Sequence, residues 1–61
     1  MNGLELRKKR QALNLSQAAL AKAAGVSRAT IERWENERFY PSPLAEQAVG
    51  KAIEELEVAD H

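Results

Sequence analysis

The chain has 61 residues with no cysteine and one histidine, and its formal net charge at pH 7 is zero. A chain this short forms one small domain without disulfides, so association with a second copy is its simplest source of extra stability. The composition argues against a metal centre, a membrane span and a signal peptide, and the absence of cysteine fits a cytoplasmic protein.

The charges are divided unevenly along the chain. Residues 1–40 contain eight Lys or Arg and four Glu, which gives +4. Residues 41–61 contain one Lys, four Glu and one Asp, which gives −4. This division has two interpretations: the first part of the chain binds a polyanion, or the charges only solvate the surface.

Leucine and alanine dominate, and strand-forming residues do not cluster, so we expect an all-α fold of four or five helices. The first expected helix covers residues 3–13, GLELRKKRQAL. Leu6 and Leu13 are seven residues apart and therefore share one face of this helix. Most of the basic residues lie away from that face, which predicts an apolar side for the core and a basic side for solvent.

The second expected helix covers residues 17–24, between Ser16 as its N-cap and Gly25 as the left-handed residue after its end. Ser27 then caps a third helix over residues 28–36. Because so few residues separate the two helices, they must cross at a steep angle, as in a helix-turn-helix. The small and apolar residues that such a pair needs for packing are all present: Leu20, Ala21, Ala24, Val26, Ile31 and Trp34.

The exposed side of the third helix is predicted to carry Arg28, Ala29 and Arg33. Arginine donates two hydrogen bonds to guanine O6 and N7, and a small apolar side chain accommodates a thymine methyl group. The N-terminal part of a recognition helix lies against base edges, so this side is predicted to read bases in the major groove. The alternative is a solvated helix face on which the arginines pair with Glu32 or Glu37.

The fourth expected helix follows the loop ERFYPSP, with Ser42 as N-cap and Pro43 as first residue, and continues to about Val58. Gly50 lies inside it at a cost of about 1 kcal/mol, so a break there, with a short fifth helix, stays open as an alternative. DNA would repel the acidic residues of this segment, so the helix is expected to face away from a bound duplex.

An apolar stripe runs along the fourth helix, and Val49, Ile53 and Leu56 on it are candidates for a dimer seam. The same stripe is typical of a helix that closes the core or binds a different protein, and both alternatives stay open. Phe39 and Tyr40 in the preceding loop are expected to cover the bundle or this seam.

The stretch LRKKRQALNLSQAALAKAAGVSRATIERWEN resembles the Cro/CI-type helix-turn-helix, the XRE-like family of phage repressors and small bacterial regulators. The resemblance covers about residues 4–38. It implies that residues 1–61 form a lambda-repressor-like DNA-binding domain, a compact bundle that binds operators as a homodimer. The segment GKAIEEL departs from the family's usual fifth helix, because Lys51 stands where an apolar residue is usual.

The resemblance also assigns roles to individual residues. Arg28, Ala29 and Arg33 match the base-reading positions. Arg10 and Glu35 match a pair that forms a structural salt bridge between the first and third helices. The residues expected at the DNA backbone are Ser16, Gln17, Ser27, Thr30, Asn36 and Arg38.

These observations predict a prokaryotic or phage transcriptional regulator, most simply a repressor, that binds a palindromic operator as a homodimer. The alternative is an antitoxin-like or anti-activator module that masks a second regulatory protein with its C-terminal helix. No nucleophile beside a base and no phosphate loop indicates an enzyme, and we expect no cofactor and no small-molecule ligand. The terminal residue, His61, is expected to be disordered.

Overall fold

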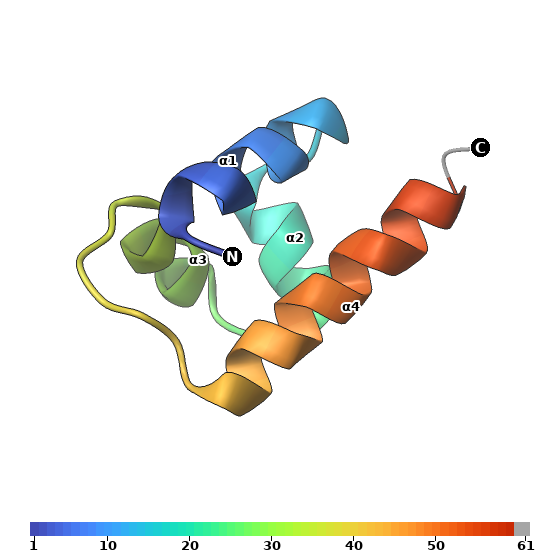
Figure 1. The fold of residues 1–61 in the computed structure, drawn as a ribbon. Coiled ribbons are helices and arrows are strands. Elements are labelled where there is room, and N and C mark those ends of the chain that lie inside the picture. Colours follow the sequence, from blue (N-terminus) through green and yellow to red (C-terminus); the bar gives the residue numbers. More distant parts are fainter. Residues whose placement is uncertain (60–61) are drawn as a thin grey trace.

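Residues 1–59, which the computed structural model describes, form four helices and no strand, as the sequence predicts (Figure 1). The elements are α1 (Gly3–Ala12), α2 (Gln17–Ala24), α3 (Arg28–Glu35) and α4 (Pro43–Ala59). No helix in this part of the chain is long and apolar enough to cross a membrane. The expectation for His61 lies outside the described residues.

Local capping explains where α1 begins and ends. The side chain of Asn2 accepts a hydrogen bond from the Glu5 N–H at 2.8 Å, and the Glu5 carboxylate accepts one from the Asn2 N–H at 3.3 Å. This capping box follows from the spacing of Asn and Glu and was missed in the sequence. At the other end Leu13 is the C-cap and Asn14 has a φ of 57°, so α1 ends one residue before the predicted boundary.

The core lies where the four helices meet. α2 packs on both α3 and α4, and α1 packs on α3 (Figure 1). The buried apolar side chains are Leu6, Leu20, Ala21, Ile31, Trp34, Val49, Ala52 and Ile53. Gly3 allows α1 to approach the end of α3, because a Cβ there would lie 2.2 Å from the Trp34 carbonyl oxygen. Trp34 is 1% exposed and is a core residue, as the sequence predicts.

α4 is one continuous helix that passes through Gly50, which decides between the two alternatives for this segment. Val49 and Ile53 are 0% and 2% exposed and lie in the core of the single chain, so these two members of the expected dimer seam are not available to a partner. The alternative that the stripe closes the core is confirmed for them. Leu56 is half-buried, and Val58, two residues nearer the end, is 75% exposed.

The loop between α3 and α4 is held against the body of the protein by Tyr40. Its ring lies 5.9 Å from the ring of Trp34, and its hydroxyl group contacts the Met1 carbonyl and the Glu46 carboxylate. The Trp34 indole N–H also donates to the Met1 carbonyl at 3.2 Å. Tyr40 thus contacts the bundle, but its side chain is 58% exposed and that of Phe39 is 39% exposed, so neither is fully covered.

Candidate nucleic-acid interface

The connection between α2 and α3 consists of Gly25, Val26 and Ser27. Gly25 has a φ of 74°, which a residue with a Cβ adopts only with strain. The Val26 N–H donates to the Ala21 carbonyl at 3.0 Å, and the Ser27 hydroxyl accepts from the Thr30 N–H at 3.1 Å. One helix is therefore terminated and the next is started within three residues, which is the local geometry of a helix-turn-helix.

α3 has one buried and one exposed side. Ile31 and Trp34 are 0% and 1% exposed and point into the core. On the other side Arg28 and Arg33 are exposed, and Ala29 is partly exposed. The three residues predicted to read bases thus lie on the accessible part of the helix. Arg28 does pair with Glu32 within the helix, as the alternative interpretation of this face expected.

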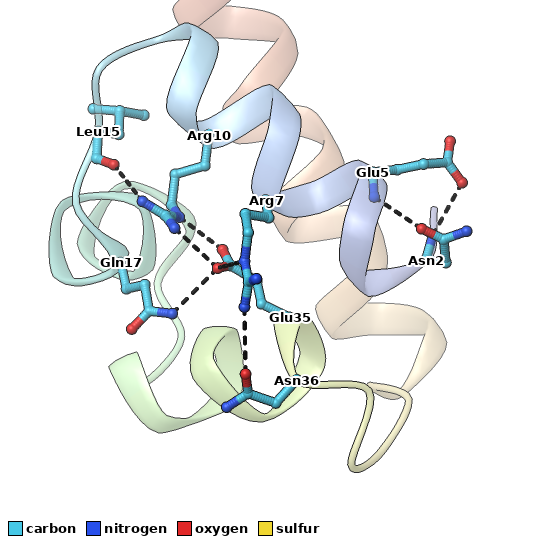
Figure 2. A network of polar contacts seen from close by, with 8 residues as sticks. All are labelled: Asn2, Glu5, Arg7, Arg10, Leu15, Gln17, Glu35 and Asn36. Carbon is cyan, nitrogen blue, oxygen red and sulfur yellow. Dashed lines mark hydrogen bonds and ion pairs between the residues drawn. The ribbon is translucent and has the colours of Figure 1, made fainter.

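A buried carboxylate joins α1 to α3. The side chain of Glu35 is 0% exposed, and its two oxygens accept hydrogen bonds from Arg10 Nε at 2.7 Å and Arg10 Nη2 at 2.9 Å (Figure 2). Arg10 also donates from Nη1 to the Leu15 carbonyl at 2.7 Å, which fixes the turn after α1. The structure therefore brings together the pair that the resemblance implied.

The electrostatics of Glu35 favour its charged form. Burial raises the pKa of the Glu35 carboxyl, but the hydrogen bonds from Arg10 and Gln17 and the charge of Arg10 lower it by more. The net effect is a pKa below the ordinary value of 4.5. In turn, the hydrogen bond to Glu35 raises the pKa of Arg10. The pair is ionised at neutral pH.

Gln17 and Asn36, both expected at the DNA backbone, belong to the same network (Figure 2). Gln17 donates from Nε2 to Glu35 Oε1 at 3.2 Å. Arg7 donates to Asn36 Oδ1 at 3.3 Å and to Glu35 Oε1 at 3.4 Å. Sequence reasoning missed Arg7, although its spacing of three from Arg10 places both arginines on one side of α1.

The other residues expected at the DNA backbone lie at the ends of the two short helices. Ser16 caps α2 by accepting from the Ala19 N–H at 3.0 Å. Ser27 caps α3 and also shares a hydrogen bond of 2.8 Å with the Thr30 hydroxyl. Arg38 is exposed beyond the end of α3. Among residues 1–59 no cluster of His, Cys, Asp or Glu is arranged to hold a metal ion.

A short turn between two packed helices, with an exposed basic side on the second, defines the class as a helix-turn-helix DNA-binding domain. Residues 6–55 match the helix-turn-helix family HTH_3. The chain therefore belongs to this XRE-like family of DNA-binding transcription regulators, and the resemblance to Cro/CI-type proteins is confirmed. No curated protein and no solved structure matches the chain.

Proposed function

We propose that the protein is a sequence-specific repressor that binds a palindromic operator as a homodimer and reads the major groove with α3. The observation that carries this proposal is the exposed side of α3, where Arg28, Ala29 and Arg33 are accessible while the opposite side is fixed in the core. The two arginines each donate to guanine O6 and N7, and Ala29 contacts a thymine methyl group.

The network around Glu35 supports this proposal because it arranges groups for the phosphate backbone. Asn36 uses its oxygen to accept from Arg7, which leaves its amide N–H groups for a phosphate oxygen. Gln17 is the first residue of α2, whose free N–H groups and dipole favour phosphate. Ser16, Ser27, Thr30 and Arg38 complete the proposed backbone contacts.

The zero net charge is compatible with DNA binding because the charges are separated along the chain. The basic excess lies in residues 1–40, which contain α3, and the acidic excess lies in the α4 segment. Such a protein attracts DNA weakly at non-specific sites, so it depends on base contacts and on dimerisation.

The test is selection of bound duplexes from a random-sequence library at about physiological salt. We expect an enriched palindrome with guanine in each half-site. Arg28→Ala and Arg33→Ala should each relax the preference at one base pair per half-site and cost about 1–3 kcal/mol of binding free energy. Arg38→Ala is the matched control, which should weaken all sequences alike. An unchanged motif in both α3 variants, or no enrichment by folded protein, contradicts the proposal.

A shallow apolar groove favours a second candidate function, a module that masks a partner protein. Leu13 and Leu15 from the turn after α1 form one side of this groove, and Leu56 and Ala59 of α4 form the other. If the groove binds a regulatory protein, that protein co-purifies with the wild-type chain and is lost from a Leu56→Asp variant, which places a charge in the groove. Co-purification of nothing but the chain itself contradicts this candidate.

A further inference from the structure

The accessible side of α3 carries an acidic residue among its basic ones. Arg28 donates from Nη1 to Glu32 Oε2 at 2.6 Å, and the two side chains are 55% and 43% exposed. They lie one helical turn apart. An exposed pair at this spacing contributes little to stability, so the fold does not depend on it.

The contact limits the positions that Arg28 adopts. A guanidinium has five N–H donors in one plane, so the bond from Nη1 leaves the other donors free for a base. An arginine already held by a carboxylate loses less side-chain freedom when it binds guanine. The pair thus presents a pre-oriented fork on the surface that, under the proposed function, enters the major groove.

The carboxylate of Glu32 also discriminates between bases without the help of Arg28. It accepts hydrogen bonds and donates none, so it pairs with the amino group of cytosine or adenine and is repelled by guanine O6 and thymine O4. Its charge is repelled by phosphates on every sequence, which weakens non-specific binding. The base preference widens the difference between the right site and the wrong ones, whereas the repulsion by phosphates acts on all sites alike.

We propose that Glu32 is a positioning and specificity residue: it orients Arg28 toward guanine and selects a base with an amino group at the neighbouring base pair. This inference rests on the proposed function. The DNA that it recognises is a half-site that contains guanine. Glu32 affects the discrimination between DNA sequences rather than folding.

The test uses Glu32→Gln and, as a matched control, Glu37→Gln. Glu37 is an exposed acidic residue just after α3, so its substitution changes the net charge equally without touching the Arg28 pair. Wild type and both variants are each selected on the same random duplex library and then measured on their enriched duplex and on a scrambled one. We expect E32Q to bind the scrambled duplex more tightly and to lose about three- to tenfold in discrimination at the two base pairs. E37Q should change both affinities by the same factor.

A second arm separates action through Arg28 from a general charge effect. In an Arg28→Ala background, E32Q should no longer alter the preference for guanine, because the side chain that it positions is absent. If E32Q and E37Q keep the wild-type motif and discrimination, the inference is overturned while the proposed function stands. If the wild type enriches no motif, the proposed function fails and the inference fails with it.

Discussion

The buried carboxylate of Glu35 forms ion pairs with two arginines whose side chains differ in exposure. The side chain of Arg10 is 13% exposed and that of Arg7 is 41% exposed. Arg10→Met should leave the Glu35 charge without its main partner and lower the free energy of unfolding by about 3–5 kcal/mol. Arg7→Met should cost less than about 1 kcal/mol, because water screens that pair. Urea denaturation of both variants measures the difference, and equal losses would contradict the assignment.

The lowered pKa of Glu35 also predicts how stability depends on pH. A carboxyl whose pKa is lower in the folded state contributes its full stabilisation above the unfolded value of about 4.5. This contribution is lost as the pH falls through the folded pKa. The free energy of unfolding should therefore fall with acidity below about pH 4.5 and do so less steeply in Glu35→Gln. Glu46→Gln is a comparison variant: contact with Tyr40 lowers the pKa of Glu46 as well, so this substitution should also reduce the slope. Equal slopes in wild type and E35Q would contradict the prediction.

At the scale of elements, α4 tolerates a change at its glycine that α1 does not. Nothing lies within 4 Å of a Cβ built on Gly50, so Gly50→Ala should raise the free energy of unfolding by about 0.5–1 kcal/mol through helix propensity. Gly3→Ala is the contrasting variant, because its Cβ would lie 2.2 Å from the Trp34 carbonyl oxygen, and it should destabilise. Thermal unfolding of both variants tests the pair. A loss of stability in G50A would indicate a break in the helix.

The elements were predictable where their signals are local. Ser16, Gly25 and Ser27 act within a few residues of themselves, so the sequence predicted both short helices and the turn between them. The role of Arg7 was not predicted, because its partners Glu35 and Asn36 lie 28 and 29 residues away in the sequence and only the folded chain brings them together. The apolar stripe of α4 predicted that one face of the helix is buried, but not whether the core or a partner buries it. In the structure the core of the same chain buries Val49 and Ile53.

The dimensions of the whole molecule restrict the geometry of the proposed homodimer on DNA. The protein measures 32 × 19 × 18 Å, and adjacent half-sites lie about 34 Å apart. In the proposed homodimer, protomers this far apart reach each other most readily along the long dimension. A helix of the length of α4 spans about 25 Å, more than either short dimension, so α4 runs along the long one. In the proposed homodimer, one end of α4 is then the expected place of contact.

The C-terminal end of α4 is the better candidate for this contact, because two groove residues, Leu56 and Ala59, and the exposed side chain of Val58 all lie near that end. Val58→Asp should leave the fold and half-site binding intact, since the side chain is 75% exposed, but should abolish cooperative binding to the full palindrome. Leu44→Asp is the matched control: it adds the same charge at a residue that is 77% exposed near the other end of α4. Titrating each variant on full-site and half-site duplexes measures the effect. Loss of cooperativity in L44D alone would place the dimer contact at the opposite end of the molecule.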